Sequence, residues 1–293
     1  MRNPATTGQG DAGPIAGEDP YRLRVLYVTD LAYQARGRRY CDEDIFLSTR
    51  LRQHFHLALC HPKDACGLMA SFDVVVVRNT GPVLHYQAAH RAFCAQAAAS
   101  GIPVFNELTG KADMAGKQYL VDLFTLGFPV IPTVDQQINL YRLPAASGLV
   151  VKPKFGADSI GLQFVDGTTI GELDTGGGNL LIQPRIDFSY EVSFYFIDHD
   201  FQYALYAPDP HRRWGLETYE PTNEDLAFAQ RFIDWNDIDH GIQRVDACRT
   251  PAGQLLLIEL EDLNPYLSLD LVGADRRESF VARMAASITQ LAR

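Results

Sequence analysis

The chain has 293 residues, of which 46% are hydrophobic and 21% are charged. This length is about twice that of a typical domain, and it predicts two domains or one domain with an inserted lid. The 26 basic and 36 acidic residues give a formal net charge of -10. Such an acidic balance argues against nucleic acid or an anionic membrane as the main partner.

Targeting signals and cysteine pairs offer little support for an exported or membrane protein. No segment approaches the roughly 20 apolar residues that cross a bilayer. Residues 1–20 lack the apolar stretch of a signal peptide and predict a flexible tail. The five cysteines include no Cys-x-x-Cys pair, which favours free thiols over disulfides or a zinc site. We therefore expect a cytoplasmic protein.

Up to residue 107, predicted strands alternate with predicted helices. Residues 72–81 contain four consecutive valines, typical of a strand that is buried on both faces. The other predicted strands are 22–30, 57–60 and 102–107, and the predicted helices are 42–55 and 83–99. This order predicts a parallel sheet, whose ligands bind at the carboxyl ends of its strands.

After residue 107 the pattern changes to short strands separated by glycine and proline. Residues 149–165 predict a hairpin with a glycine-containing tip. Residues 180–186 predict a strand that contains Pro184, so it should lie at a sheet edge or end there. Further hairpins are predicted over 190–207 and 241–265, and an amphipathic helix over 276–291.

Several common active-site motifs are absent from the sequence. The first predicted strand is not followed by the Gly-x-Gly-x-x-Gly motif of dinucleotide-binding proteins. Residues 110–118 resemble a phosphate-binding P-loop, but they have one residue too many between the glycines, and Gln118 replaces the required Ser or Thr. No Gly-x-Ser-x-Gly motif supports nucleophilic hydrolysis. These chemistries are therefore disfavoured.

Three acidic residues in the C-terminal part are expected on one face of a sheet. Asp246 and Glu259 lie on predicted strands joined by a short turn, and Glu261 is two residues beyond Glu259. Carboxylates gathered on one face repel each other unless a cation neutralises them, and oxygen-only ligands suit Mg²⁺ or Mn²⁺. The sequence predicts a divalent-metal site here, with an exposed acidic sheet face as the alternative.

The lysines of this arginine-rich chain suggest a phosphate site. Lys152 ends a predicted buried strand and Lys154 begins the following loop. Gly156 and Gly161 in that loop would let backbone amides approach an anion. We interpret the loop as a lid over phosphate, and an ordinary hairpin tip with two solvated lysines is the alternative.

Read in order, these segments resemble the ATP-grasp superfamily of carboxylate-amine ligases. The resemblance covers residues 107–270 and is carried by Lys117, VVKPKFGADSIG, LLIQPRID, RVDAC and LLLIELEDLNP. It implies an α/β protein in which a small parallel-sheet domain precedes the ATP-grasp fold. The implied division is a flexible tail (1–20), a substrate-side domain (21–106), a central lid domain (107–186) and a C-terminal domain with the metal site (187–293).

The resemblance also implies roles for individual residues. Lys117 would contact phosphate of ATP, and Lys152 would reach the phosphates or the adenine N7. The loop with Lys154, Gly156, Ser159 and Gly161 would close over the triphosphate. The adenine would lie against Gln183, Pro184, Arg185 and Ile186, with Asp187 near the ribose. Asp246, Glu259 and Glu261 would bind Mg²⁺ or Mn²⁺, and Arg244 would stabilise the acyl phosphate, which makes Arg244 and Lys117 the catalytic candidates.

Two features depart from the family pattern. The commonest ending is Glu-x-Asn-x-x-Pro, whereas here Glu259-Leu-Glu261 comes before Asn264-Pro265. Whether Asn264 replaces or supplements Glu261 as a metal ligand is left open. Pro184 and Arg185 also stand where an acidic residue is common.

The implied activity is formation of a C–N bond on a small carboxylate through an acyl phosphate. Arg78, Asn79 and Thr80 follow the valine strand, and with Tyr266 and Ser268 they predict a pocket for an amino-acid-like acid. The alternative is that Arg78 and Asn79 only cap the next helix. The C-terminal motif is similar to that of D-cycloserine synthetases, in which ATP activates O-ureido-D-serine and the molecule's own nitrogen closes the ring.

Two other functions stay open at this point. One is an intermolecular ligase that joins an amino acid to an amine or forms a dipeptide. The other is a nucleotide-binding regulator that keeps the fold without the chemistry. A homo-oligomer is also left open by the sequence.

Overall fold

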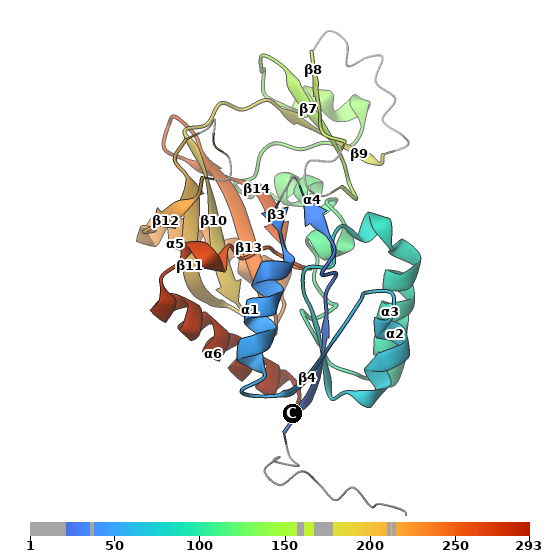
Figure 1. Cartoon of the computed structure of the whole chain (residues 1–293). Helices are drawn as coiled ribbons and strands as arrows, with labels where there is room; N and C mark the ends of the chain where they lie inside the picture. Colours follow the sequence, from blue (N-terminus) through green and yellow to red (C-terminus); the bar gives the residue numbers. More distant parts are fainter. Residues whose placement is uncertain (1–21, 36–37, 157–160, 167–177, 210–211, 213–214) are drawn as a thin grey trace, which may run out of the picture.

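The computed structural model describes residues 22–35, 38–156, 161–166, 178–209, 212 and 215–293. Within them, the strands form a four-stranded, a three-stranded and a five-stranded sheet, together with a two-stranded ribbon of β2 (Gln34–Ala35) and β3 (Arg38–Arg39) (Figure 1). The predicted tail 1–20 and the loop tip 157–160, which includes Ser159, lie outside the described residues. The architecture is mixed α/β, as the sequence predicts.

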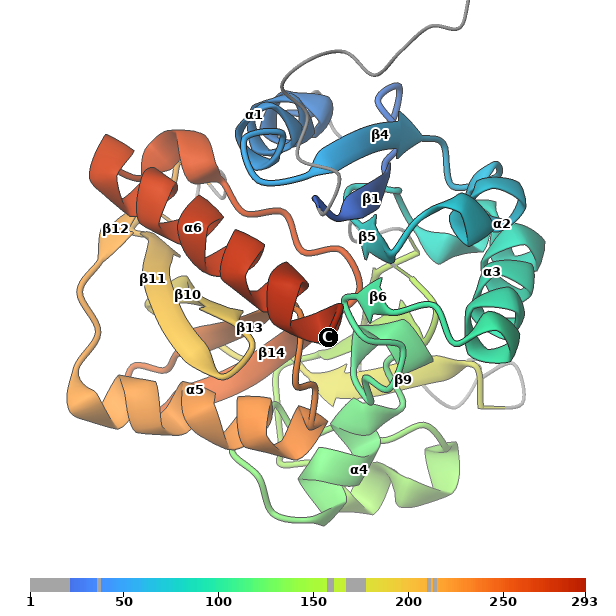
Figure 2. The same ribbon diagram turned by 90° about the horizontal axis from the view of Figure 1, so that it is seen from below.

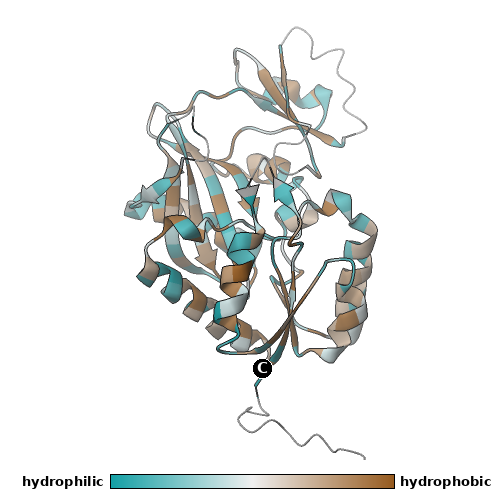
Figure 3. Cartoon of the chain, viewed as in Figure 1, coloured by the Kyte–Doolittle hydropathy of each residue, from teal (hydrophilic) through white to brown (hydrophobic). Residues whose placement is uncertain are grey.

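The four-stranded sheet is parallel throughout, in the order β4-β1-β5-β6. Helices cover both of its faces, and its strands are mainly hydrophobic (Figure 3). Val74 and Val76 of β5 share a core with α1, whereas Val75 and Val77 pack with α2 and α3. The bounds are β1 (Arg24–Val28), α1 (Cys41–Leu51), β4 (His56–Cys60), α2 (Ala65–Leu68), η1 (Met69–Ser71), β5 (Val74–Val77), η2 (Val83–His85), α3 (Gln87–Ser100) and β6 (Val104–Phe105).

The three-stranded sheet has the order β8-β7-β9 and lies at the top of the view in Figure 1. It comprises β7 (Leu149–Pro153), β8 (Gln163–Val165) and β9 (Leu180–Pro184). Pro184 is the last residue of an edge strand, which confirms the prediction from its missing N–H group. The connection from the parallel sheet contains η3 (Asp113–Ala115), α4 (Tyr119–Thr125) and η4 (Gln137–Arg142).

The five-stranded sheet is antiparallel, in the order β12-β11-β10-β13-β14. Figure 2 shows α5 and α6 on opposite faces of it. The bounds are β10 (Tyr190–Ile197), β11 (Asp200–Ala207), β12 (Glu217–Tyr219), α5 (Asn223–Asn236), β13 (Ile242–Arg249), β14 (Leu255–Glu261), η6 (Leu269–Leu271) and α6 (Ala274–Leu291). The predicted hairpins and C-terminal helix are therefore present.

One face of the five-stranded sheet is apolar at one end and polar at the other. Tyr195 and Ile197 of β10 belong to a core shared with β1, α1 and α6. Glu191 and Ser193 continue the same face, because alternate residues of a strand point to the same side, and they line a cavity. The cavity thus begins where the shared core ends, and the core anchors the strands that carry its polar residues.

Helix α5 is absent from the sequence predictions. Its start is stabilised by a capping box: the Thr222 hydroxyl accepts a hydrogen bond from the Asp225 N–H at 3.2 Å, and the Asp225 carboxylate accepts one from the Thr222 N–H at 3.0 Å. The Thr-x-x-Asp spacing of residues 222–225 is the sequence signal that could have predicted the start of this helix. In the described part of the chain, none of the helices combines the length and apolar composition that membrane crossing requires.

The shared core makes a stability prediction for α6. Phe280 is 1% exposed, and its ring centroid lies 5.8 Å from that of Tyr203. Replacing Phe280 with Ala should lower the free energy of unfolding by about 3–5 kcal/mol, because it removes buried apolar surface and leaves a cavity. Urea denaturation measures this change. The exposed Gln290→Ala on the same helix should change stability by less than about 0.5 kcal/mol. Equal effects of the two substitutions would contradict the packing described.

Candidate functional site

A cavity of about 600 Å³ lies between the parallel sheet and the two antiparallel sheets. Its lining comes from the loops after β1 and β5, the segment around η3, the residues after β7, strands β10, β13 and β14, and the loop 263–268. The carboxyl ends of the parallel strands therefore face it, as expected for a ligand site of an open α/β sheet. A cavity of this volume suits a small molecule or a nucleotide.

The three predicted metal ligands meet in this cavity. Asp246 of β13 pairs in register with Glu259 of β14, next to a register shift between Asp246 and Ala247. One ligand atom from each of Asp246, Glu259 and Glu261 lies within 4.8 Å of the other two. All three side chains are half-buried and line the cavity. We call these three residues the acidic triad.

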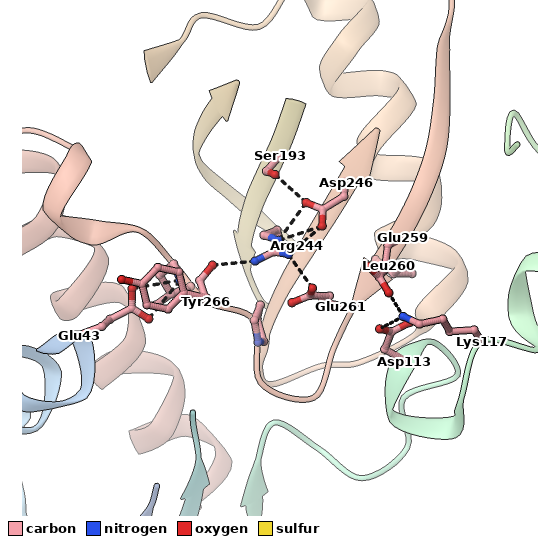
Figure 4. Close-up of polar contacts among 12 residues, drawn as sticks. Glu43, Asp113, Lys117, Ser193, Arg244, Asp246, Glu259, Leu260, Glu261 and Tyr266 are labelled. Atoms are coloured by element: carbon pink, nitrogen blue, oxygen red, sulfur yellow. Dashed lines mark hydrogen bonds and ion pairs between the residues drawn. The ribbon is translucent and has the colours of Figure 1, made fainter. Parts of the chain in front are cut away.

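Arg244 joins two members of the acidic triad to the neighbouring loop. Its Nε and Nη2 donate to the two Asp246 carboxylate oxygens at 2.9 and 2.8 Å, and Nη2 also donates to Glu261 at 2.6 Å (Figure 4). Nη1 donates to the backbone oxygen of Tyr266 at 2.8 Å. Burial alone would lower the pKa of Arg244, but Asp246 and Glu261 raise it above its usual value. The guanidinium is therefore charged and held in one orientation.

Lys117 reaches the acidic triad from the opposite side. Its Nζ forms ion pairs with Glu259 and, at 2.6 Å, with Asp113 (Figure 4). The Asp113 carboxylate also accepts a hydrogen bond from the Tyr119 hydroxyl at 3.0 Å. Lys117 is only 5% exposed, yet it lines the cavity. Its backbone N–H donates to the Lys154 carbonyl at 2.9 Å, which ties this segment to the end of β7.

Two predicted phosphate-binding residues of the lid, Lys154 and Gly156, line the same cavity. Lys154 Nζ pairs with Asp135 at 2.9 Å and also bonds to Gln118. Lys152 and Gly161 are not among the lining residues. Burial, followed by repulsion from Lys117, lowers the pKa of Lys152 to about 7. A half-buried ammonium with so low a pKa would gain from an anion nearby.

The segment predicted to contact adenine does not contribute to the described lining of this cavity. Gln183 is buried and its amide nitrogen donates to the Thr133 hydroxyl at 2.8 Å. Arg185 is exposed and lies 5.8 Å from the centroid of the Phe164 ring. The adenine-binding role of residues Gln183, Pro184, Arg185, Ile186 and Asp187 stays a prediction.

Of the five residues predicted to contact substrate, three line the cavity, namely Asn79, Tyr266 and Ser268. The ring centroid of Tyr266 lies 4.5 Å from that of Tyr40, another lining residue, with the two rings tilted by 30°. Thr80 lies behind this wall, where its hydroxyl bonds to Tyr86 and accepts a hydrogen bond from the Asn264 amide at 2.9 Å.

Arg78 differs from the expectation that it lines the pocket, because it is fully buried beneath it. Its Nη2 pairs with Glu43 at 3.0 Å and donates to the Pro265 carbonyl at 2.9 Å. Both Glu43 carboxylate oxygens accept a hydrogen bond from the Leu267 N–H. A buried guanidinium needs a carboxylate partner, and this pair attaches the parallel sheet to the loop that carries Tyr266 and Ser268.

Asn264 is held by its amide nitrogen, which donates to Thr80 and to the Gly81 carbonyl at 3.2 Å. These bonds connect the segment after β14 to the loop after β5. Its role as a metal ligand stays a prediction, and the structure adds a contact with the opposite wall of the cavity.

Two polar residues at the site were missed from the sequence. Ser193 donates to Asp246 at 2.6 Å, and the register places the two residues directly opposite each other on β10 and β13. Placing the two predicted hairpins side by side in one sheet would have brought Ser193 opposite Asp246. Asp113, the partner of Lys117, lies on a 3₁₀ turn within the segment 110–118 that was rejected as a P-loop. The four-residue spacing between Asp113 and Lys117 could have indicated their ion pair.

The acidic triad fits a divalent cation with oxygen ligands. Its ligand atoms are close enough to share one ion, and the donor set has the carboxylate chemistry that Mg²⁺ prefers. Burial raises the pKa of Glu261 to about 7, opposed by Arg244 and reinforced by the charge of Asp246. A bound cation would favour the charged form. Arg244 and Lys117 neutralise part of the charge in the structure.

Comparison with known proteins gives a likeness of fold. No protein-family model matches the chain, and no curated protein matches its sequence. The D-cycloserine synthetase DcsG is 20% identical, with a TM-score of 0.71 over 92% of this chain and 100% of that one. The D-alanine–D-alanine ligase from Bacillus anthracis in complex with ATP is 13% identical, with a TM-score of 0.63 over 92% and 97% of the two chains.

A third structure, the ATP-grasp ligase PsnB with a phosphomimetic variant of its minimal precursor, Mg and ADP, is 12% identical. Its TM-score is 0.61 over 92% of this chain and 97% of that chain. All three structures align along nearly the full length of both partners. The chain therefore has the ATP-grasp fold.

Proposed function

We propose that this chain is an ATP-dependent ligase that forms a C–N bond through an acyl phosphate on a small carboxylate. The observation that carries the proposal is the convergence of the acidic triad, Arg244 and Lys117 in one cavity. The same cavity is bounded by Lys154 of the lid and by the loops of the parallel sheet. The three solved structures compared above, which share this fold, are ligases or synthetases.

The first step would transfer the γ-phosphoryl group of ATP to an oxygen of the substrate carboxylate. The bond between this group and ADP breaks, and the products are an acyl phosphate and ADP. Lys117, Lys152 and Lys154 supply positive charge for the phosphates. A Mg²⁺ ion held by Asp246, Glu259 and Glu261 would neutralise charge that spreads over the phosphoryl oxygens.

The second step would be attack of an amine on the acyl carbon. The C–N bond forms, phosphate leaves, and the amine nitrogen loses a proton. Arg244 lies beside the acidic triad with its guanidinium fixed by Asp246 and Tyr266, a placement suited to stabilising the oxyanion of the tetrahedral intermediate. The lid loop would exclude water that hydrolyses the acyl phosphate.

The cyclisation of O-ureido-D-serine to D-cycloserine, a step of antibiotic biosynthesis, is the specific reaction we favour. The alignment with DcsG has a TM-score of 0.71 and covers the whole DcsG chain. The small polar wall of Asn79, Tyr266 and Ser268 suits an amino-acid-like acid. The second candidate is an intermolecular ligase, supported by the D-alanine–D-alanine ligase fold.

A non-catalytic nucleotide-binding regulator is the contrasting hypothesis. Incubation with ATP, Mg²⁺, hydroxylamine and a panel of carboxylic acids separates the two. Hydroxamate and ADP identify a ligase, whereas nucleotide binding without turnover across the panel favours the regulator. O-ureido-D-serine without hydroxylamine then separates cyclisation from intermolecular ligation by the product formed.

Asp246→Asn should lower hydroxamate formation by about 100-fold or more, because it removes a metal-binding charge from the acidic triad. The side chain keeps its size, so the circular dichroism spectrum should match that of the wild type. Asp234→Asn, which alters a carboxylate on α5 that is 64% exposed, should keep full activity. Full activity of Asp246→Asn would contradict the assignment of Asp246 as a metal ligand.

Binding of ADP with Mg²⁺ should take up a proton above about pH 7. In the free protein Lys152 has a pKa of about 7, and nearby phosphates would raise it, so affinity should fall as the pH rises from about 7 to 9. Calorimetry in two buffers of different ionisation enthalpy measures the uptake. Lys152→Arg should abolish it because a guanidinium stays charged, and unchanged uptake in this variant would rule out Lys152 as its source.

A further inference from the structure

Asp262 follows directly after the last residue of β14, next to Glu261 of the acidic triad. Side chains alternate along a strand, so Glu259 and Glu261 line the cavity while Asp262 points into the protein. Asp262 is 0% exposed and is not among the described lining residues of the cavity. The proposed chemistry does not use it directly.

The Asp262 carboxylate is held by neutral donors. It accepts hydrogen bonds from the backbone N–H groups of Met114 at 2.7 Å and Ala112 at 3.1 Å, and from the Asn236 amide at 3.2 Å. Within the part of the chain that the structure describes, no Lys, Arg or His side chain donates a hydrogen bond to Asp262. A buried carboxylate without a cationic partner is costly, so an apolar residue would stabilise the fold better unless these bonds serve a purpose.

Those bonds fix the segment that presents Lys117. Ala112 and Met114 flank Asp113, whose carboxylate pairs with Lys117 Nζ at 2.6 Å. Asn236 reinforces the same segment, since its side-chain oxygen accepts a hydrogen bond from the Lys111 N–H at 2.7 Å. Asp262 thus connects the strand of the acidic triad to the segment of the phosphate-binding lysine.

A second contact joins the same two segments. The Leu260 N–H of β14 donates to the Tyr119 hydroxyl oxygen at 2.7 Å, and that hydroxyl donates to Asp113 at 3.0 Å. Leu260 of β14 and Asp262, directly after this strand, therefore both connect to the segment around Asp113. The position of Lys117 relative to Glu259 is set by this double attachment.

Gly110 shows how closely the segment is fitted to the carboxylate. A Cβ atom at this position would overlap the Asp262 carboxylate and would lie 3.0 Å from Ile238 Cδ1. Any side chain at residue 110 would push the segment away from β14. The absence of a side chain here lets the backbone approach Asp262 closely enough for the two N–H bonds.

We propose that Asp262 is a positioning residue, which fixes Lys117 against the acidic triad and thereby sets the affinity for nucleotide phosphates. This inference rests on the proposed function, because it needs Lys117 to contact phosphate. Asp262 itself contacts no reactant. It acts through the backbone of residues 112–114 and the carboxylate of Asp113.

The test uses the affinity of the full-length protein for AMP-PNP with Mg²⁺, measured by calorimetry. Asp262→Asn places an amide NH₂ against backbone N–H donors, so it should raise the dissociation constant about tenfold. Gly110→Ala should weaken binding similarly while leaving the carboxylate intact. It also serves as the second variant if Asp262→Asn fails to fold.

A double-mutant cycle separates positioning from general destabilisation. In a Lys117→Ala background, Asp262→Asn should change AMP-PNP affinity by less than about twofold, because the residue it positions is gone. Asp225→Asn is the matched control. Asp225 is another buried carboxylate bonded to backbone and side chains, outside the described lining of the cavity, and its loss should lower stability without changing the affinity.

The outcomes are distinct. Wild-type affinity in both Asp262→Asn and Gly110→Ala, or an undiminished effect in the Lys117→Ala background, would overturn the positioning role while leaving the ligase proposal intact. An equal loss of affinity in Asp225→Asn would also overturn it, because the effect would then be global. Absence of AMP-PNP binding by the wild type would instead refute the proposed function itself.

Discussion

The repulsion among three carboxylates on one sheet face is the constraint on which the site depends. Asp246, Glu259 and Glu261 approach within 4.8 Å, and their charges are offset from two sides by Arg244 and Lys117. Such a cluster is unfavourable without cations, so its neighbours are held by a dense set of hydrogen bonds. A divalent ion with nucleotide phosphates would satisfy the same carboxylates, which is why the cluster suits phosphoryl transfer to an acid.

The rest of the fold supplies rigid attachments for this cluster. The polar end of the five-stranded sheet continues directly into the core shared with α1 and α6. The buried Arg78–Glu43 pair fixes the loop that carries Tyr266, whose carbonyl in turn accepts from Arg244. Asp262 holds the segment of Lys117 on the other side. The residues that we propose to bind nucleotide, metal and substrate come from distant parts of the chain, and these contacts keep them in fixed mutual positions.

The sequence was sufficient for the features that depend on local pattern. The valine strand, the edge position of Pro184 and the convergence of the acidic triad follow from periodicity, from the missing N–H group and from side-chain alternation. Contacts between distant segments could not be read this way. Arg78 was expected in the pocket because it ends a parallel strand, but its burial depends on Glu43, 35 residues earlier. Asp262 was passed over because two of its donors are backbone N–H groups of a segment 148 and 150 residues away.

The central claim is that the acidic triad holds a divalent ion against nucleotide phosphates. A crystal structure with AMP-PNP and Mn²⁺, with data collected for the anomalous signal of manganese, tests it most directly. The account predicts an anomalous peak between the carboxylates of Asp246, Glu259 and Glu261 and the phosphate oxygens, with Lys117 turned from Glu259 toward the phosphates. Nucleotide bound elsewhere, or bound in this cavity without a manganese peak at the triad, would contradict it.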